Sequence, residues 1–462
     1  MNILNYNNLE LPEVVDLFSG CGGLAYGFKK AGFEIGHGIE LVESAAKTAS
    51  YNLYWKYGKE NEHICGDITL LSPEMFADNI SKNGCIVIGG PPCQAYSRIG
   101  RAKLRSLGED RVHTNDSRGL LYHDFLKFAL ELDSKAIIME NVPEATNFGG
   151  LNVPQHVCEI LERNGYEAYW TILNAADYGV PQIRERVFVM AIRKDIKHTF
   201  NLPVPTHNSP ENRITPNQMR FKKFAENANF RYPNKASDNA ENWVTVREAL
   251  SDLPVLFPNS KSGYKLYKLN IQLRYETEPA NSFQFLMRDW YGKIEESVTG
   301  HGYRKTLRDF PIFERMNEGD NYIQASQIAE DLLLEACAAN TIDKHTDEEA
   351  YVALRKKIVP PYDRNKFETK WRKLNGSLPS HTVVAHLDTD TYSHIHPWEA
   401  RGLSVREAAR LQSFPDGFLF QCSMGDAFRQ IGNAVPPLLA NAIAETMKQN
   451  LTHGRQVNGT AK

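Results

Sequence analysis

The sequence lacks any long hydrophobic run. No apolar stretch among its 462 residues reaches the roughly 20 residues that a membrane-spanning helix requires. The first residues, Met1 to Tyr6, lack the basic start and apolar core of a secretory signal. With 24% charged and 42% hydrophobic residues, the composition is typical of a soluble globular protein. We therefore expect a cytoplasmic protein with one large domain and a second, smaller one.

Cysteine is scarce and scattered. The seven cysteines are odd in number, which favours a reducing compartment and argues against a disulfide framework. Two close pairs occur, His63 with Cys65 and His156 with Cys158, but neither has a second pair at metal-ligand spacing. We interpret both pairs as structural and expect no metal.

The chain also has no excess of positive charge. Its net charge of -3 does not indicate a nucleic-acid partner, although a local footprint can hide in such a sum. Basic residues mixed with aromatics recur in the middle of the chain, at 220–224, 264–268, 303–305 and 366–373. An ordinary solvated surface accounts for them, and composition alone favours it; the functional alternative is a surface that meets phosphates and bases.

What the sequence does contain, from residue 13 to about 195, is an alternation of strand and helix patterns. The expected strands are 13–18, a second ending at Glu40, 85–88, 136–139 and 187–192, and the expected helices include 24–31, 44–51 and 122–132. This alternation predicts an α/β fold with a mostly parallel sheet covered on both faces. Further on, Ser404 and Glu407 have the spacing of a capping box before a helix at 405–411.

A cysteine follows one of these strands directly. Gly89-Gly90-Pro91-Pro92-Cys93-Gln94 places the Cys93 thiol just past strand 85–88, at the strand end where α/β sheets keep their ligands. The two prolines fix the turn. The pattern predicts a nucleophile on a rigid turn, and a loop with a buried thiol is the structural alternative.

A glycine-rich turn, Asp16 to Gly23, links the first strand to its helix. Glycines there allow the backbone to approach a ligand closely. The compact spacing differs from the dinucleotide fingerprint and suits a nucleoside without a pyrophosphate. Glu40 stands roughly 20 residues on, where an acid binds ribose hydroxyls, and Asp67 follows a third strand, within reach of an adenine edge. A tight turn with two solvated carboxylates is the alternative.

A carboxylate and two guanidinium groups join the thiol. Glu140 follows strand 136–139, and Arg184 and Arg186 precede strand 187–192. We expect them to converge with Cys93, although a surface salt-bridge cluster would have the same sequence.

Together these motifs resemble the cytosine-C5 DNA methyltransferase family, and they occur in family order. The matching segments are 16–23, Pro-Pro-Cys-Gln at 91–94, 116–121, Glu-Asn-Val at 140–142, 182–186, 406–416 and 430–437. The resemblance covers about 13–195 and 375–450. It implies an S-adenosylmethionine-dependent, Rossmann-like catalytic domain in two parts, 1–195 and 376–462. Residues 196–375 would form a smaller, irregular target-recognition domain, and the helix from Pro437 would pack beside the first motif.

The resemblance also assigns residue roles. Cys93 would add to C6 of a flipped-out cytosine, Glu140 would contact N3, Arg184 would contact O2, and Arg186 would orient the site. S-adenosyl-L-methionine, which leaves as S-adenosylhomocysteine, would have Phe18 on its adenine, Glu40 on its ribose and Asp67 on its amino group. The other cofactor residues would be Asp16, Gly20, Gly22, Gly23, Ile68, Pro91, Leu121 and Asn433. DNA contacts would come from Gln94, Ser97, Arg98 and Arg101, in or beside a loop that closes over the DNA.

The leading hypothesis is therefore a bacterial or phage DNA (cytosine-5-)methyltransferase. It would act on double-stranded DNA as a monomer, either as an orphan or beside a separately encoded restriction endonuclease. Two other hypotheses remain: an RNA substrate, against which the long middle region argues, and a non-catalytic DNA-binding regulator, against which the intact Cys93, Glu140 and Arg184 argue.

Overall fold

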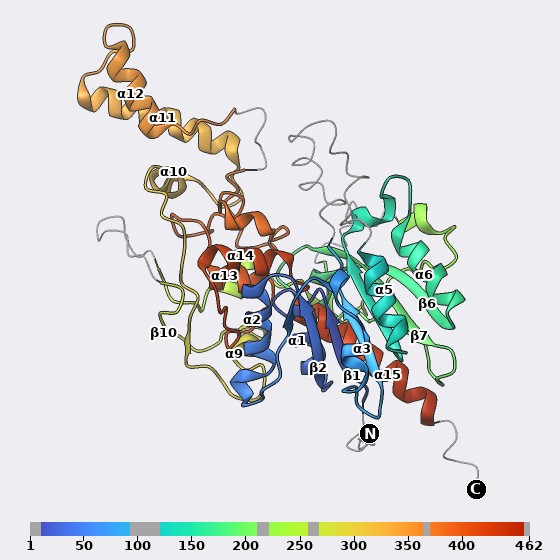
Figure 1. Cartoon of the computed structure of the whole chain (residues 1–462). Helices are drawn as coiled ribbons and strands as arrows, with labels where there is room; N and C mark the ends of the chain where they lie inside the picture. The colour runs from blue at the N-terminus through green and yellow to red at the C-terminus, as the bar shows by residue number, and fades with distance from the viewer. Residues whose placement is uncertain (1–10, 93–120, 210–220, 257–267, 364–369, 457–462) are drawn as a thin grey trace. The chain divides into compact units, whose positions relative to one another are not determined.

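The computed structural model describes residues 11–92, 121–209, 221–256, 268–363 and 370–456. It divides into two compact units, which are treated separately (Figure 1). Unit 1 comprises residues 1–243 and 434–462, and unit 2 comprises residues 244–433. This division by compactness does not test the functional boundaries expected from the sequence, so those stay a prediction.

Unit 1 contains a seven-stranded sheet in the order β3-β2-β1-β4-β5-β7-β6. The strands are β1 (Glu13–Leu17), β2 (Ile35–Glu40), β3 (Ile64–Cys65), β4 (Cys85–Gly89), β5 (Ala136–Asn141), β6 (Tyr166–Asn174) and β7 (Glu185–Arg193). Strands β1 to β5 pair in parallel, and β7 runs antiparallel to both β5 and β6. The chain order reverses between β1 and β4, so the carboxyl ends of these strands form a topological switch point, where α/β sheets bind ligands.

Helices cover both faces of this sheet. On one face, side chains of α3 (Glu74–Ala77), α5 (Tyr122–Glu131) and α6 (Val153–Arg163) form a core with alternate strand residues such as Val87 and Ile137. The intervening residues, for example Ile86 and Ile138, are also fully buried. Burial on both faces is the pattern of a parallel sheet covered by helices, so the expected fold class is confirmed.

The carboxyl-terminal helix α15 (Pro437–Gln456) packs against α1 (Gly23–Lys30), as expected. Lys448 Nζ donates a 2.9 Å hydrogen bond to the carbonyl of Ala31, at the end of α1. A Cβ atom added to Gly27 would lie 2.4 Å from the Cβ of Ala440, so the two helices cross where only glycine fits. Unit 1 is therefore built from both ends of the described chain.

Shorter elements complete unit 1. They are α2 (Glu43–Leu53), the 3₁₀ turns η1 (Trp55–Tyr57), η2 (Ile68–Leu70), η5 (Pro143–Asn147), η6 (Ala175–Tyr178) and η7 (Lys222–Phe224), and the two-stranded pair β8 (His207–Asn208) and β9 (Glu241–Asn242). Phe221 and Phe224, from the first basic-aromatic cluster, pack against the sheet core near Trp170 of β6. Their rings therefore serve the core of unit 1.

Unit 2 is mostly helical and irregular. Its elements are α8 (Val246–Leu250), β10 (Leu273–Arg274), α9 (Ser282–Arg288), β11 (Ser297–Val298), α10 (Phe310–Arg315), α11 (Tyr322–Asn340), α12 (Glu348–Ile358), η8 (Ala385–Asp388), α13 (Val405–Leu411) and α14 (Met424–Asn433). The expected capping box of Ser404 and Glu407 is confirmed at the start of α13. Among the described residues, no helix combines the length and apolar character needed to cross a membrane.

Buried ion pairs hold this irregular unit together. Arg410 is fully buried and donates to Asp252 at 3.0 Å and to Asp416 at 2.5 Å, and Arg401 donates to Glu399 and Glu407 at 3.0 and 2.6 Å. Each charge has a partner of opposite sign. Removing Arg401 would leave the buried carboxylates of Glu399 and Glu407 without their guanidinium partner, at a cost of about 3–5 kcal/mol. The motif at 406–416 therefore contributes a structural framework.

Candidate active site

The loop after β1 has a strained backbone conformation. Phe18 has φ 55°, in the left-handed region, and Gly20 and Gly22 follow with φ 55° and 86°. For an aromatic residue this conformation costs on the order of 1–3 kcal/mol and persists where the surroundings enforce it. The turn aims the loop across the carboxyl end of β1, and Gly22 then precedes the first residue of α1.

Glu40, at the end of β2, closes this loop. Its two carboxylate oxygens accept hydrogen bonds from the backbone N–H groups of Gly20, at 2.7 Å, and Val42, at 2.8 Å. Each oxygen can accept a further donor, so the side chain is held in place with capacity left for ligand hydroxyls. Burial raises the pKa of Glu40, and the backbone N–H groups partly oppose this rise.

Asp16 lies beneath the same loop and is 1% exposed. Neither carboxylate oxygen makes a hydrogen bond of normal geometry with the described residues. Burial and the neighbouring Glu40 carboxylate raise the pKa of Asp16, and the backbone of Ala25 offsets this rise only in part. A buried acid without a full set of partners favours a cationic ligand near this end of the sheet.

His63 lies beside the loop after β1 and contacts it. It is 3% exposed, and its Nδ1 lies 2.8 Å from Ser19 Oγ in the loop after β1. Burial lowers the pKa of His63 to about 3, so the ring is neutral at physiological pH. A Cβ atom on Gly38 would meet the ring at 2.5 Å, so this glycine of β2 makes room for it. No sequence motif marked this support of the loop.

The remaining expected cofactor residues differ in exposure. Asp67 is exposed and accepts hydrogen bonds from the Thr69 N–H and hydroxyl at 3.0 and 2.8 Å, while Ile68 is buried. Leu121 is half-buried immediately before α5, in unit 1. Asn433 is the exposed last residue of α14, in unit 2, so it belongs to a different unit from the β1 loop.

The end of β4 lies tightly against its neighbours. A Cβ atom on Gly89 would come within 2.1 Å of the Leu17 carbonyl oxygen, and one on Gly90 within 2.8 Å of Glu140 Oε2. The Asn141 amide donates to the Pro91 carbonyl at 3.4 Å. The two glycines and the proline therefore bring the chain that leads into Cys93 alongside the end of β5.

Glu140 and Arg186 form an ion pair beside this turn. Arg186 Nε lies 2.9 Å from Glu140 Oε1, and the side chains are 13% and 12% exposed, respectively. Because β7 runs antiparallel to β5, its first residues lie at the edge where β5 ends. Burial raises the pKa of Glu140, and the positive charges of Arg186 and Arg184 oppose this rise.

Arg184 lies deeper than Arg186. It is 1% exposed, and its Nη2 donates a 3.1 Å hydrogen bond to the carbonyl oxygen of Ala434, where the chain re-enters unit 1. The Arg186 guanidinium pairs with Glu140 and remains partly exposed, and the positive charge of Arg184 also acts on Glu140.

Some expected site residues cannot be placed. Cys93, Gln94, Ser97, Arg98 and Arg101 lie outside the described residues. Within the described ranges, one group of three side chains, His396, Glu399 and Glu407, has metal-ligating geometry. The two carboxylates of this group, Glu399 and Glu407, already pair with the guanidinium of Arg401.

The fold and this edge define a class of protein. The sheet is parallel except for β7, and a glycine-rich loop follows β1 and contacts an acid, Glu40, on β2. This is the architecture of a Rossmann-like transferase that binds a nucleoside cofactor at the switch point. The sequence profile of the family described as C-5 cytosine-specific DNA methylase matches residues 13–449. The chain belongs to this family, whose members are S-adenosylmethionine-dependent DNA (cytosine-5-)-methyltransferases.

Individual relatives agree with the family. M.OihORF3336P of Oceanobacillus iheyensis, a candidate type II methyltransferase, is 56% identical over 96% of this chain and 97% of its own length. The type II methyltransferase M.AgeI of Thalassovita gelatinovora is 31% identical over 94% of this chain and 99% of its own. A prophage-encoded candidate DNA modification methyltransferase of Escherichia coli has the same fold, with a TM-score of 0.62, 21% identity and coverage of 96% and 99%.

Proposed function

We propose that the protein methylates C5 of one cytosine within a specific duplex DNA sequence, through a covalent adduct between Cys93 and C6 of the base. The observation that carries this proposal is the Glu140–Arg186 pair against Gly90, at the turn that leads into Cys93. The target atoms lie inside the base stack, so the cytosine must leave the duplex to reach this edge.

The proposed chemistry distributes one step to each residue. The Cys93 thiolate forms a bond to C6, and Glu140, whose pKa is raised by burial, supplies a proton to N3. Electron density then reaches C5. S-adenosylmethionine, when bound, supplies the electrophilic methyl group. A base then removes the C5 proton, the bond from Cys93 to C6 breaks, N3 returns its proton to Glu140, and the aromatic ring is restored.

The two arginines take different parts in this proposal. Arg186 is partly exposed and paired with Glu140, which suits it to hold that carboxyl group and to meet the O2 edge of the base. Arg184 is buried on a backbone carbonyl, which suits it to support the site from behind. The direct contact to O2, which the family resemblance assigned to Arg184, is therefore better proposed for Arg186.

The proposed cofactor residues fit S-adenosylmethionine by their chemistry. Glu40 has acceptor capacity for two ribose hydroxyls, and the buried acid Asp16 favours a ligand that carries a positive charge. Phe18, turned by its strained backbone, is the proposed stacking partner of adenine, with Asp67 and Ile68 beside the base. Gly20, Gly22, Gly23, Pro91, Leu121 and Asn433 complete the proposed set, and the proposal needs no metal.

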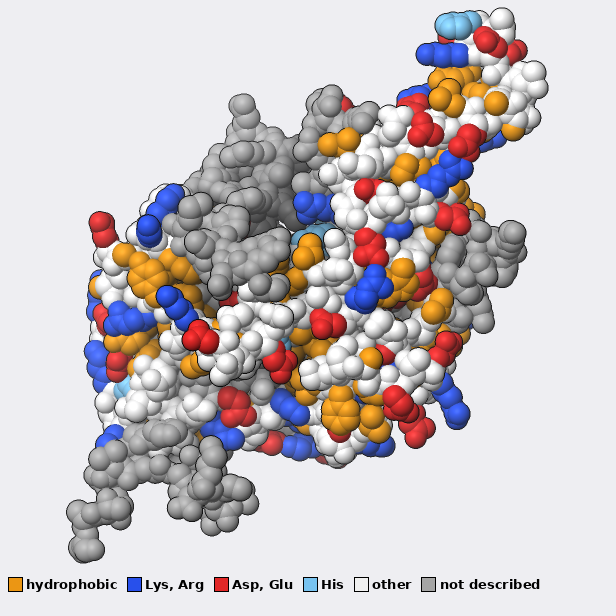
Figure 2. Space-filling model, turned by 180° about the vertical axis from the view of Figure 1, so that it is seen from behind, with side chains coloured by type: hydrophobic (Ala, Val, Ile, Leu, Met, Phe, Trp, Pro, Cys, Tyr) orange, Lys and Arg blue, Asp and Glu red, His pale blue; other side chains and the backbone are white. Residues whose placement is uncertain are grey.

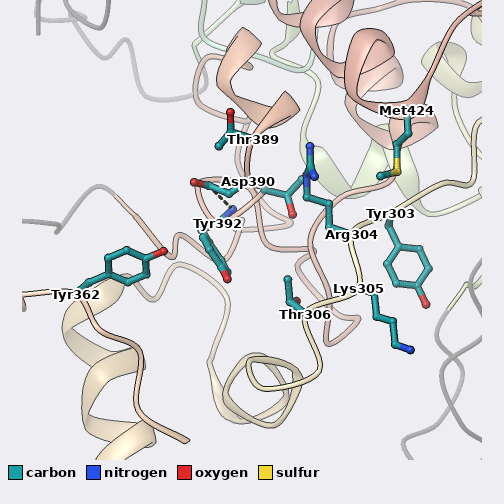
Figure 3. A pocket seen from close by; sticks show the side chains of 10 residues that line it. Tyr303, Arg304, Lys305, Thr306, Tyr362, Thr389, Asp390, Tyr392 and Met424 are labelled. Carbon is teal, nitrogen blue, oxygen red and sulfur yellow. Dashed lines mark hydrogen bonds between the residues drawn. The ribbon is translucent and has the colours of Figure 1, made fainter. Parts of the chain in front are cut away.

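Unit 2, which overlaps the proposed recognition domain at 244–375, contains a cavity that suits DNA contact. A cavity of about 580 Å³ is lined by Tyr303, Arg304, Lys305, Thr306, Tyr362, Thr389, Asp390, Thr391, Tyr392 and Met424 (Figure 3). Arg304 donates to the Leu387 carbonyl at 3.3 and 3.4 Å, and Tyr392 stacks on Trp371 at 4.8 Å. Oriented cations and a fixed aromatic wall are suited to phosphates and bases.

On the face shown in Figure 2, acidic and basic side chains are interspersed, in line with the net charge of -3. We propose that the contacts to DNA come from unit 2 and from Gln94, Ser97, Arg98 and Arg101, and that the protein acts as a monomer. Type II relatives favour a modification role beside a separately encoded endonuclease.

The test is base-resolution mapping of 5-methylcytosine on unmethylated plasmid after incubation with the protein and S-adenosylmethionine. We expect methylation at one recurring sequence, and none with Cys93→Ala. Methylation by Cys93→Ala at the wild-type rate would contradict the adduct. Clean DNA binding without any methylation would favour a DNA-binding regulator, and transfer to tRNA in place of plasmid would favour an RNA substrate.

A further inference from the structure

The chain crosses between the two units twice, and both crossings are fixed to one short segment of unit 1. The chain leaves unit 1 after Trp243 and returns at Ala434. The Trp243 indole N–H donates a 2.8 Å hydrogen bond to Asp177 Oδ1, and Arg184 donates a 3.1 Å hydrogen bond to the Ala434 carbonyl. Asp177 and Arg184 lie only seven positions apart, between β6 and β7.

This segment, residues 174–186, is a closed loop with internal support. The Asn174 side chain accepts hydrogen bonds from the Arg184 and Ala176 N–H groups at 3.2 and 3.3 Å, and the Ala175 N–H donates to the Arg184 carbonyl at 2.8 Å. The two ends of the loop are thereby joined. We expect a displacement at Asp177 to reach Arg184 and the start of β7, because these hydrogen bonds join the two ends of the loop.

The segment that leads out of unit 1 at Trp243 makes further contacts near Asp177. The Thr206 N–H donates to the Asp177 carbonyl at 3.0 Å, and the Trp243 N–H donates to the Asn208 carbonyl at 2.9 Å. Gly179, with φ 79°, ends η6, and a Cβ atom there would meet the His207 ring at 2.8 Å. Strands β8 and β9 therefore seat Trp243, which is 7% exposed, against the loop.

The loop ends in the proposed catalytic pair. Arg186 follows Arg184 by two residues and pairs with Glu140 at 2.9 Å. We propose that Asp177 is a positioning residue. By holding Trp243, it ties the path into unit 2 to the loop that sets Arg186, so that engagement of DNA by unit 2 is transmitted to the catalytic pair. This inference rests on the proposed function, since it assigns DNA recognition to unit 2.

A charged acceptor suits this role. A hydrogen bond to a carboxylate is stronger than one between neutral groups, and an indole N–H has one donor and therefore one direction. Asp177 neighbours Tyr178 on the same turn, and His207 of β8 and Glu241 of β9 lie 3.6 Å apart. Variants must therefore separate the Trp243–Asp177 bond from general damage to this region.

The test compares single-turnover methylation of unmethylated plasmid by the full-length protein at saturating S-adenosylmethionine. We expect Asp177→Ala and Trp243→Phe each to lower the rate about tenfold, the cost of one hydrogen bond to a charged group. The double variant should be no slower than either single variant. Asp177→Asn retains an acceptor oxygen and should stay within about twofold of wild type. Binding of S-adenosylhomocysteine should be unchanged in all of them.

Tyr178→Phe is the matched control. It deletes a 3.3 Å hydrogen bond from the same turn to the Pro203 carbonyl, away from either crossing. We expect it to lower the melting temperature and leave the rate unchanged. Rates equal to wild type in Asp177→Ala and Trp243→Phe, or additive losses in the double variant, would overturn the proposal. If Asp177→Ala fails to fold, the comparison of methylation rates between Trp243→Phe and Asp177→Asn tests the proposal.

A second readout separates this inference from the proposed function. Amide hydrogen exchange of residues 174–186 should change when plasmid DNA binds the wild-type protein, and Trp243→Phe should abolish that change. A wild-type protein that shows this response but transfers no methyl group would refute the proposed function and leave the coupling in place. A methylating wild-type protein whose loop exchange ignores DNA would refute the coupling.

Discussion

Replacing Gly27 by alanine would probe how closely the two ends of the chain must approach for the cofactor loop to form. Gly27 lies in the middle of α1, and an alanine Cβ there would stand 2.4 Å from the Ala440 Cβ and 2.6 Å from the Asn441 backbone nitrogen. Part of the obstacle is backbone of α15, which cannot rotate out of the way. Helix α1 or α15 must therefore shift as a whole.

The size of the effect follows from two opposing contributions. Alanine is favoured over glycine inside a helix by about 1 kcal/mol. Overpacking of a tight core costs about 1–3 kcal/mol, and a rigid backbone contact belongs at the upper end of that range. We therefore expect a net loss of about 2 kcal/mol in the free energy of unfolding of unit 1. For a domain of this size that lowers the melting temperature by about 4–8 °C.

The assays are calorimetric unfolding and titration with S-adenosylhomocysteine. Because α1 begins directly after the loop containing Gly20 and Gly22, a shifted helix should also weaken binding of this product. Gly425→Ala is the control: it lies in α14 with no atom closer than 3.9 Å to an added Cβ, so it should be neutral or slightly stabilising. A Gly27→Ala protein with unchanged melting temperature and product affinity would refute the close crossing.

Two further predictions concern titrating groups. Arg186→Gln removes the cation that lowers the pKa of Glu140, so the rate should fall and the alkaline limb of the pH–rate profile should move to higher pH; an unmoved limb would contradict the pairing. Unit 2 buries His301, His394 and His396 and half-buries His381, and burial lowers the pKa of all four, to about 4 for His381 and His396. The unfolded chain binds protons first, so unit 2 should keep its full stability above about pH 6.5 and lose about 1.4 kcal/mol per pH unit per histidine below it. Denaturant titrations at pH 7, 6 and 5 measure this slope, which His381→Asn should reduce by about a quarter.

The sequence was a good guide to the strand ends that carry chemistry. Short apolar runs located β1, β4 and β5, and the polar residues that follow them, Asp16 and Glu140, lie at the carboxyl edge as expected. This succeeds because a parallel strand buried on both faces must be apolar throughout, which makes its end visible as a change of composition. The capping box at Ser404 was equally local, and it is confirmed.

Strand β6 was not anticipated, although a signal was present. Tyr166, Ala168, Trp170 and Ile172 are buried, and Glu167 and Thr171 between them are polar, which is close to the period of a strand. The reversed direction of β7 was also not anticipated, since strand direction depends on the connection and not on the residues of the strand. Because of this reversal, Arg186 at the start of β7 lies at the same edge of the sheet as Glu140 near the end of β5, and the two side chains can pair.

The basic-aromatic clusters show why composition misleads in the middle region. Lys373 and Trp371 look like surface binding residues in the sequence, but Trp371 is fully buried and the Lys373 ammonium is buried, donating to the Phe313 and Met316 carbonyls at 2.8 Å. A long lysine stem packs against apolar residues while its head finds carbonyl partners, which only the three-dimensional structure reveals. Arg304 and Lys305, from a cluster of the same composition, line a cavity instead.

The couplings between distant segments were invisible to the sequence for a related reason. Asp177 and Trp243 are 66 positions apart, and Arg184 and Ala434 are 250 apart, yet each pair makes one hydrogen bond. Neither residue type is unusual at its position, so no local pattern marks them. Their importance comes from where the chain passes between units, which is a property of topology. If the loop at 174–186 transmits recognition to Arg186, then residues that touch neither base nor cofactor influence whether a cytosine is methylated.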